Sequence, residues 1–462
     1  PLDRRRPNAR PSLAARPRAP MRSAIVVGGG ISGAAISRFL AEGGMRVTLL
    51  EKSQQLCSGA TWHAAGLVTR FGGSPKLKKL HVKAVDMMSD LHDRFGVDMH
   101  ISGSVRIVEK GDSARLAEAR QHVAMAALYD SPGFETRLVG AEEIKAMHPL
   151  INTSNVDCGV WTPGDGDVDP TRLTNCVASL AKAAGAEFRL RTGVTGVERL
   201  QGGRFAVATD QGERLEADVL VNCAGLWTRE LAAMLGLQVP AVVIEHQYVI
   251  SEALGAIEAR QREGKPRLPV LRDLAGSSYI RQERAGLLIG PYEEDCRVTA
   301  WGDAPPPYWT MDLFPDALER IEDNLMHAIE LVPALGDVGF ASVVNGPTIW
   351  APDGLARCGR TDIANYYDLN TQTYGIAQSL PLAELLAGII LHGEEPWAMP
   401  DVCPLRFGPG PAPWATPGFV TDRVRETYAH NNKVSFPYEN RPGGRARLPG
   451  TGLTEALREE GA

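Results

Sequence analysis

The 462-residue chain lacks three features that would have placed it in other classes of protein. No apolar run reaches the ~18 residues that span a bilayer, because the best candidate, 380–391, is short and contains Glu384. The formal net charge of −6 gives no basic surface for nucleic acid. The seven cysteines are scattered without a CxxC pair, which argues against a disulfide scaffold or a zinc site. We therefore expect no membrane span, no nucleic-acid partner, no metal and a reducing compartment.

A complete nucleotide-binding unit is present at residues 25–52. A short apolar strand leads into Gly28, Gly30 and Gly33 in a GxGxxG pattern, and an amphipathic helix follows. The first glycine permits a tight turn, the second lets the backbone approach a pyrophosphate, and the third allows close packing of helix on strand. Glu51 ends the next strand at close to the ~20-residue spacing at which a carboxylate accepts hydrogen bonds from ribose hydroxyls. The unit predicts a dinucleotide without a 2′-phosphate.

The next segment, CSGATWHAAGL at residues 57–67, is rich in small residues, which lets backbone lie against a flat ring. Together with the nucleotide unit it resembles the dimethylglycine and sarcosine dehydrogenase family, within the larger D-amino-acid-oxidase-like group of FAD enzymes. The resemblance implies FAD as the cofactor, bound covalently from His63 to the flavin 8α-methyl carbon. A neutral imidazole is a competent nucleophile for that bond. The alternative is that His63 only packs against the ring or hydrogen-bonds to it.

The resemblance implies an α/β fold in which a Rossmann-type FAD-binding domain carries an inserted antiparallel-sheet substrate domain. Later segments also match the family, including ADVLVNCAGLW at 217–227 and TYGIAQ at 373–378. The residues expected to contact FAD are Gly28, Gly30, Ile31, Ser32, Gly33, Glu51, Lys52, Ser58, Thr61, Trp62, His63, Ala65, Gly66, Leu67, Val194, Asn222, Ala224, Gly225, Trp227, Gly375 and Ile376.

A helix expected at 382–391 should point its N-terminus at the flavin, where the positive end of the dipole stabilises an anionic reduced ring. The sequence departs from the family just before it. Relatives have a glycine-rich GGAG stretch where this chain has SLPLA, at 379–383. The departure predicts side chains in place of bare backbone at the flavin's pyrimidine end, with Pro381 in the first helical turn, where proline is tolerated.

Alternating apolar and polar residues between 242 and 341 predict an antiparallel sheet. The segments IEHQYVISE, at 244–252, and LRDLAGSSYIRQERAGLLIGPYE, at 271–293, resemble the family's strands that face the flavin and substrate. The resemblance makes His246, Tyr248, Tyr279 and Arg281 the candidate catalytic residues. Because side chains alternate along a strand, the two members of each pair share a face. Either tyrosine is otherwise read as an ordinary packing residue of the sheet.

At 44% hydrophobic and 23% charged, the composition suits a globular enzyme of two or three domains. Residues 1–20 are rich in arginine and proline, and we expect a flexible N-terminus with Met21 as the start; the prolines disfavour the amphipathic helix of a mitochondrial presequence.

The predicted parts are FAD-binding at 21–98, 151–241 and 342–400, substrate-binding at 99–150 and 242–341, and a linker-like extension at 401–462. In longer relatives such a linker leads into a folate-binding aminomethyltransferase domain, which we expect to be absent.

The resemblance predicts oxidative demethylation of an N-methylated amino acid such as dimethylglycine or sarcosine, in the cytoplasm or, in a eukaryote, the mitochondrial matrix. Hydride leaves the N-methyl carbon for flavin N5, and water hydrolyses the iminium to formaldehyde. His246 or Tyr279 takes the amine proton, and Arg281 grips the substrate carboxylate, with Arg70 as second choice. Two alternatives remain: oxidation of another amino or 2-hydroxy acid, and a catalytically weakened flavoprotein with a regulatory role. The sequence predicts neither the electron acceptor nor the oligomeric state.

Overall fold

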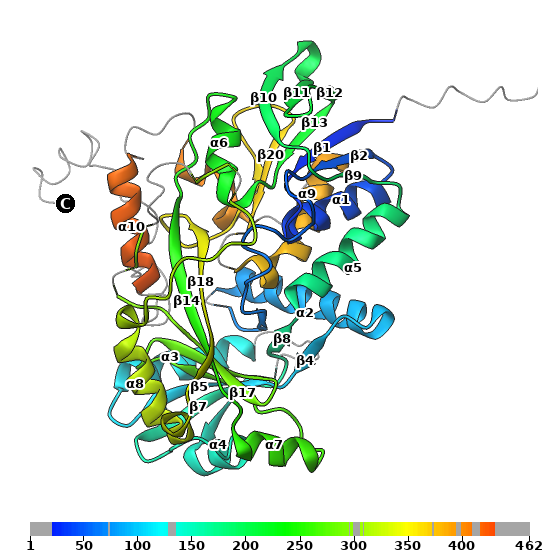
Figure 1. Cartoon of the computed structure of the whole chain (residues 1–462). Coiled ribbons are helices and arrows are strands. Elements are labelled where there is room, and N and C mark those ends of the chain that lie inside the picture. Colours follow the sequence, from blue (N-terminus) through cyan, green and yellow to red (C-terminus); the bar gives the residue numbers. More distant parts are fainter. Residues whose placement is uncertain are drawn as a thin grey trace, which may run out of the picture.

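The computed structural model describes residues 21–429, except 73, 128–134, 295, 299–304, 308, 372–373, 394–398 and 409–415. Two large sheets dominate it, one in the nucleotide-binding half and one in the substrate half (Figure 1). The expectations for residues 1–20 and 430–462, and for Thr373 of TYGIAQ, lie outside the described residues. Within them, the parallel sheet and the larger, mainly antiparallel sheet give the predicted α/β fold.

The nucleotide-binding half is a six-stranded sheet, parallel except at one edge, where β19 runs antiparallel to β20. Its strands, in spatial order, are β19 (Arg357–Arg360), β20 (Tyr366–Asn370), β13 (Val219–Asn222), β1 (Ser23–Val27), β2 (Arg46–Leu50) and β9 (Glu187–Arg189). Alternate residues of β1 face opposite layers. Ala24 and Val26 pack into the core that the helices form, whereas Ile25 and Val27 pack toward a small three-stranded sheet.

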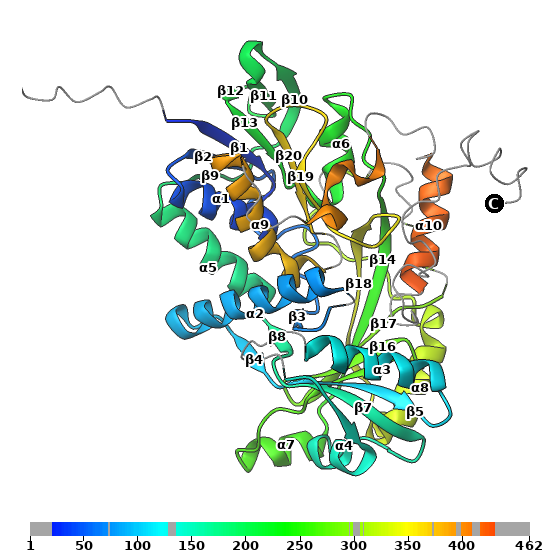
Figure 2. The ribbon, with the colours of Figure 1, turned by 180° about the vertical axis from the view of Figure 1, so that it is seen from behind.

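Four helices supply the covering layer on one side of this sheet (Figure 2). They are α1 (Ile31–Glu42), α2 (Pro75–Phe95), α5 (Pro170–Ala183) and α9 (Gly375–His392). The small sheet on the other side consists of β10 (Val194–Arg199), β11 (Phe205–Thr209) and β12 (Arg214–Ala217), and the short helix α6 (Thr228–Ala233) also packs there. A second three-stranded sheet, of β3 (Leu67–Val68), β8 (Gly166–Val168) and β4 (Met99–Ile101), lies between the two halves of the chain.

The substrate half is an eight-stranded sheet, antiparallel except where β15 runs parallel to β5. In spatial order it contains β18 (Phe340–Trp350), β14 (Val242–Ser251), β17 (Gly286–Pro291), β16 (Ser278–Glu283), β15 (Val270–Asp273), β5 (Ser104–Glu109), β7 (Val156–Thr162) and β6 (Arg137–Gly140). Helices α4 (Ala141–Met147), α7 (Gly255–Arg262) and α8 (Glu322–Leu331) cover one face, and α3 (Ser113–Ala126) packs beside β5 and β7.

Two expected boundaries between the halves are displaced. We placed 151–241 in the nucleotide half, but β7 pairs with β5 and β6 in the substrate sheet. We placed 342–400 there as well, but β18 runs to Trp350 as the edge partner of β14. The physical reason is that both strands are apolar segments whose partners lie elsewhere in the chain, so their own sequences do not say which sheet they join.

The helix expected at 382–391 begins earlier, at Gly375, and Pro381 lies inside it rather than in its first turn. The helix continues through the proline because the flanking residues from Ile376 to Ala383 are all buried in the core. Among the described residues, α9 is the one helix long and apolar enough to cross a membrane by length and composition. Its candidate span is 72% buried inside the structure, so α9 is a core helix of the nucleotide half.

The extension expected to be linker-like contains an ordered helix, α10 (Pro417–Ala429). It lies alongside β14 and β18 (Figure 1). Val420, Val424 and Tyr428 of this helix are fully or almost fully buried in a cluster with residues of the substrate sheet. These apolar positions recur at a helical spacing of four residues, so the helix buries one face and leaves the other polar.

Candidate active site

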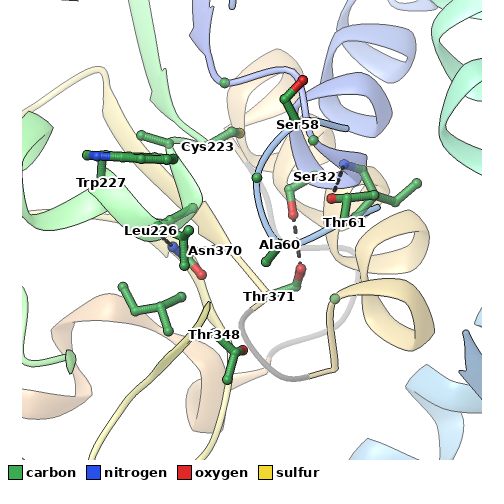
Figure 3. Close-up of a pocket in the computed structure, with 18 of the residues that line it drawn as sticks. Ser32, Ser58, Ala60, Thr61, Cys223, Leu226, Trp227, Thr348, Asn370 and Thr371 are labelled. Atoms are coloured by element: carbon green, nitrogen blue, oxygen red, sulfur yellow. Dashed lines mark hydrogen bonds between the residues drawn. The ribbon is translucent and has the colours of Figure 1, made fainter. Parts of the chain in front are cut away.

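A cavity of about 790 Å³ runs between the two halves of the molecule. This volume lies in the upper part of the range for small-molecule and cofactor sites. Its walls come from the β1–α1 turn, the segment 58–69, the end of β13, the inner strands of the substrate sheet and the start of α9. Figure 3 shows part of it, with Ser32, Ser58 and Thr61 on one wall facing Cys223 and Trp227 on the other.

The GxGxxG turn has the geometry that its glycines predict. Gly28 has φ +111°, which L-residues with side chains rarely adopt, and a Cβ there would overlap the Cys223 carbonyl oxygen. A Cβ on Gly33 would overlap the Gly28 carbonyl oxygen, so this glycine serves helix packing and does not line the cavity. Gly30 does line it, immediately before the first residue of α1. The free N–H groups at this helix N-terminus suit a pyrophosphate.

Glu51 lines the cavity, and backbone groups hold its carboxylate in place. Oε2 accepts a hydrogen bond from Gly29 N at 2.6 Å, and Oε1 accepts one from Ser53 N at 2.8 Å. Beside it, the Lys52 ammonium lies over the Trp227 ring, 3.0 Å from the centroid. Burial lowers the pKa of Lys52 to about 8, although Glu51 and Glu230 oppose the shift. This end of the cavity is fixed and acidic, as a ribose site requires.

The first residues of α9 form part of the same cavity. Gly375, Ile376 and Ala377 line it, so this helix N-terminus faces the site. In front of it, Thr371 Oγ1 lies 3.0 Å from Ser32 Oγ and 3.0 Å from Ser379 Oγ. The stretch SLPLA at 379–383 is buried behind this contact and does not line the cavity. Its departure from the family pattern therefore changes the packing of α9, not the cavity wall.

His63 projects from the loop 57–66 over a glycine of the substrate sheet. A Cβ on Gly346 would lie 2.5 Å from His63 Cε1, so the ring occupies space that only glycine leaves free. Burial lowers the pKa of His63 to about 4, which makes the imidazole neutral at neutral pH. Its Nε2 is buried and has no hydrogen-bond partner among the described residues. Because His63 lines the cavity, this nitrogen is available to a bound cofactor.

Three of the four candidate catalytic residues line the cavity: His246 and Tyr248 from β14, and Tyr279 from β16. Tyr279 lies over Gly290, its partner on β17, where any Cβ would overlap the phenol ring. Burial raises the pKa of Tyr248 to about 12, and raises that of Tyr279 further. Burial, with His63 and Arg320 nearby, lowers the pKa of His246 to about 4. The phenols stay protonated, whereas the imidazole stays neutral.

Arg281 does not line the cavity, and the expectation that it grips a substrate is wrong. Its guanidinium donates to the Ala65 carbonyl oxygen at 3.0 Å and to Glu283 at 2.6 Å, so it fastens the loop 57–66 to the substrate sheet. Arg70 does not line the cavity either: it forms an ion pair with Asp86 at 2.6 Å, and its buried Nε and Nη1 have no partner among the described residues. The arginine that does line the cavity is Arg272, on β15 opposite Tyr279.

Arg272 has neither a hydrogen-bond nor an ion-pair partner among the described residues, and its buried Nε is unpaired. The adjacent strand places a second arginine, Arg106, beside it in register. Burial and the charge of Arg272 lower the pKa of Arg106 to about 10. The carboxylates of Asp165 and Glu118 partly compensate the charge of Arg106. Sequence reasoning missed Arg272, although it is the arginine of the LRD triplet that precedes the SSYIRQE strand.

Most residues expected to contact FAD line the cavity. The exceptions are Gly33, Trp62 and Asn222. Asn222 is buried behind the wall, where its amide donates to the Thr228 carbonyl oxygen at 2.9 Å and to Tyr366 Oη at 3.0 Å. Lining residues that the sequence analysis did not name include Glu230, Arg272, Tyr292, Trp309, Thr348 and Asn370. Arg272, Tyr292 and Thr348 lie in segments that resemble the family, but the residue pattern does not show which side chains reach the cavity.

The residues present fit FAD. The glycine-lined turn leaves open backbone where a pyrophosphate would lie, the fixed carboxylate of Glu51 lies at one end, and the unpartnered His63 Nε2 lies toward the other. Such a cavity, with a dinucleotide turn at one end and titratable side chains at the other, defines the class of flavin-dependent oxidoreductases. Residues 23–389 match the family model described as "DAO: FAD dependent oxidoreductase", and the chain belongs to this family.

Two curated relatives sharpen the match. The chain is 36% identical to "Dimethylglycine dehydrogenase, mitochondrial" of Homo sapiens over 441 residues, which covers 94% of this chain and 49% of the relative. It is 33% identical to "4-methylaminobutanoate oxidase (formaldehyde-forming)" of Paenarthrobacter nicotinovorans over 345 residues, covering 74% of this chain and 40% of the relative. The chain thus spans half the length or less of these relatives. The matches confirm the family predicted from the GxGxxG and WHAAG segments.

The fold is also similar to that of a dehydrogenase of known structure. The crystal structure of L-proline dehydrogenase from P. horikoshii superimposes with a TM-score of 0.71 at 22% identity. The similarity covers 85% of this chain and 99% of that chain. At this identity the likeness establishes the fold alone, and it confirms the predicted combination of a nucleotide-binding domain with an antiparallel substrate sheet.

Proposed function

We propose that the chain catalyses FAD-dependent oxidative demethylation of an N-methylated amino acid. One observation carries the proposal. The same cavity is lined by Arg272, whose buried Nε has no hydrogen-bond partner among the described residues, and by His246, whose imidazole is neutral. Bound FAD supplies the two-electron acceptor for the N-methyl hydride. Water then adds to the iminium carbon and releases formaldehyde, the demethylated amine and one proton. The names of both curated relatives, a dimethylglycine dehydrogenase and a formaldehyde-forming methylaminobutanoate oxidase, are consistent with this reaction.

Arg272 is the proposed partner of the substrate carboxylate. A guanidinium binds a carboxylate through two parallel hydrogen bonds, and the free Nε side of Arg272 offers one donor of such a pair. Tyr279 lies across from it on the neighbouring strand and keeps its phenolic proton, so it can donate a further hydrogen bond. This assignment replaces Arg281, whose guanidinium is already bound by the protein.

His246 is the proposed acceptor of the amine proton. Hydride leaves only when the amine lone pair is free, so an ammonium substrate must first lose its proton. Burial raises the pKa of the Tyr279 phenol, so this side chain stays protonated at neutral pH and cannot accept the amine proton. The His246 imidazole is neutral and can accept a proton, and the same burial that lowers the pKa of His246 disfavours a bound ammonium.

We also propose that His63 Nε2 forms the covalent bond to FAD. Three properties of this side chain support the bond: it is neutral, its Nε2 has no partner among the described residues, and Gly346 leaves room for the ring. Ring nitrogens without a hydrogen-bond partner among the described residues also occur on the buried His122 and His148, but of these three histidines only His63 lines the cavity. The bond would retain the cofactor and hold the flavin edge beside β18.

Anaerobic flavin bleaching tests the proposed reaction. The purified flavoprotein is mixed with dimethylglycine, sarcosine, 4-methylaminobutanoate or N,N-dimethylethanolamine, which lacks the carboxylate. We expect the N-methyl amino acids to reduce the flavin and release one formaldehyde per flavin, and dimethylethanolamine to react at least tenfold more slowly. A 2-hydroxy acid or an unmethylated amino acid that reduces the flavin faster than all of these would overturn the proposal.

A further inference from the structure

A buried chain of hydrogen bonds lies behind His246 and begins on the C-terminal helix α10. His246 Nδ1 lies 2.8 Å from Tyr428 Oη, and Tyr428 Oη donates to Glu293 Oε2 at 2.6 Å. Glu293 is ion-paired to Arg320, which also pairs with Glu245 at 2.7 Å. The side chains of Glu293, Glu245 and Arg320 are each less than 10% exposed, and Tyr428 is fully buried. These hydrogen bonds are therefore shielded from solvent from Tyr428 to Arg320, and the partly buried His246 at their other end faces the cavity.

The direction of these hydrogen bonds fixes the tautomer of His246. A phenol has one hydrogen, and Tyr428 donates it to the ionised carboxylate of Glu293. The phenol oxygen can then only accept, so His246 Nδ1 must carry the proton that it donates. In a neutral imidazole the other nitrogen, Nε2, is then unprotonated. Nε2 has no partner among the described residues, and His246 lines the cavity.

We propose that Tyr428 is a positioning residue that holds His246 in its Nδ1–H tautomer and so makes Nε2 the acceptor of the substrate proton. The proton moves from the substrate ammonium to Nε2, which leaves a neutral amine and an imidazolium whose Nδ1–H still donates to Tyr428. The Glu293 carboxylate, one hydrogen bond further on, then faces a positive ring. The proton-transfer part of this inference rests on the proposed function, whereas the tautomer does not.

Groups from several elements of the structure face His246. His63, which is neutral, approaches from the loop 57–66, and the Tyr292 ring lies 5.2 Å away after β17. Arg320, before α8, opposes the imidazolium. Two buried carboxylates, Glu245 and Glu293, face this single buried guanidinium, and the Arg297 that also reaches Glu245 is half exposed. Burial, His63 and Arg320 together lower the pKa of His246, so its imidazole is neutral before the substrate proton arrives.

Helix α10 is built to hold Tyr428 at this point. The preceding residue, Thr427, donates to the Pro352 carbonyl oxygen at 2.6 Å, and the Trp350 ring meets the Tyr428 ring edge-on at 5.2 Å between centroids. Thr427 and Tyr428 therefore provide a matched pair on one helix. The first anchors the helix without contacting His246, whereas the second contacts it directly.

The experiment uses the full FAD-loaded chain labelled with ¹⁵N-histidine, with His246→Gln to assign the His246 signals. We expect His246 in the parent and in Thr427→Val to show the Nδ1–H tautomer, and Tyr428→Phe to lose that preference. We also expect Tyr428→Phe to slow anaerobic reduction by an N-methyl amino acid roughly 10²-fold, with a displaced pH profile and unchanged flavin content. Thr427→Val should retain the pH profile of the parent.

An unchanged His246 tautomer in Tyr428→Phe would overturn the inference, and so would a changed tautomer with an unaltered rate and pH profile. A tautomer change in Thr427→Val of the same size would also overturn it, because the effect would then belong to the docking of α10. If no N-methyl amine reduces the parent flavin, the proposed function fails. The NMR result still decides the assignment of Tyr428, since it needs no substrate.

Discussion

The two ends of the cavity differ in how they hold Glu51 on one side and His63 and Arg272 on the other, although Glu230 Oε2 at the nucleotide end is also buried without a hydrogen-bond partner among the described residues. At the nucleotide end, both carboxylate oxygens of Glu51 are bonded to backbone N–H groups, and Lys52 lies over an aromatic ring. At the substrate end, His63 Nε2 and Arg272 Nε are buried without a partner among the described residues. Protein interiors rarely leave such groups unpaired. At the nucleotide end, backbone hydrogen bonds hold Glu51 in position. At the substrate end, His63 and Arg272 have nitrogens that are available to bond to the cofactor and the substrate.

The largest expected effect follows from removing the His63 imidazole at the substrate end. In His63→Ala, no flavin should remain on the polypeptide after acid precipitation, whereas the parent should keep it. Gly346→Ala should weaken the same bond without touching the imidazole, because its Cβ would lie 2.5 Å from the ring. The matched control is Gly255→Ala, at the exposed first residue of α7, where φ is not positive and a Cβ would meet nothing within 4 Å. Flavin that passes wholly into the supernatant from the parent would eliminate the tether while leaving the FAD site intact.

The next effect concerns the proton at the substrate end. His246→Phe and Tyr279→Phe should each slow anaerobic flavin reduction by about 10²- to 10⁴-fold, the usual contribution of a positioned acid or base. The loss should be larger for His246, because Tyr279 is proposed only to donate a hydrogen bond. Stopped-flow absorbance measures both rates at matched flavin content. Reduction as fast as in the parent would show that the variant residue takes no part.

Two arginines on neighbouring strands sharpen the comparison further. Arg272→Gln should raise the KM for dimethylglycine roughly tenfold to a hundredfold, since a hydrogen bond between charged groups contributes about 1.5–3 kcal/mol. It should also erase the preference for dimethylglycine over dimethylethanolamine. Arg281→Gln should lower stability but keep that preference, because Arg281 is bonded to Ala65 and Glu283. If the two variants exchange these behaviours, Arg281 is the carboxylate partner after all.

The same contrast explains what the sequence could and could not predict. Gly28, Gly33 and Glu51 belong to one continuous unit, so their spacing alone predicts the turn and the carboxylate that the structure has. Arg272, Gly346 and Tyr428 lie on three separate elements, and their pattern has no local period to detect. The error at Arg281 has a similar origin. Alternation puts it on the face of Tyr279, but a long guanidinium reaches sideways to whichever acceptor lies nearest.

A smaller effect is expected when the Glu51 carboxylate at the nucleotide end is removed. In a His63→Ala background, which makes FAD exchangeable, Glu51→Ala should weaken FAD binding by more than tenfold through loss of charge-assisted hydrogen bonds to ribose. Titration with FAD, followed by fluorescence quenching, measures the difference. Part of the loss will come from Gly29 N and Ser53 N, which Glu51 now bonds. Equal affinity in the single and double variants would separate Glu51 from the ribose.

The smallest effect tests whether a buried histidine outside the cavity behaves like those inside it. Burial lowers the pKa of His148 to about 3, and this residue does not line the cavity. Because the unfolded histidine titrates near 6.5, the unfolded chain binds the proton first as the pH falls. His148 should therefore reduce the free energy of unfolding by on the order of 1 kcal/mol between pH 7 and pH 5.5. Urea unfolding at both pH values should show a shallower pH dependence in His148→Leu than in the parent. An equal slope would mean that His148 is protonated in the native state, and that burial alone does not keep a histidine of this fold neutral.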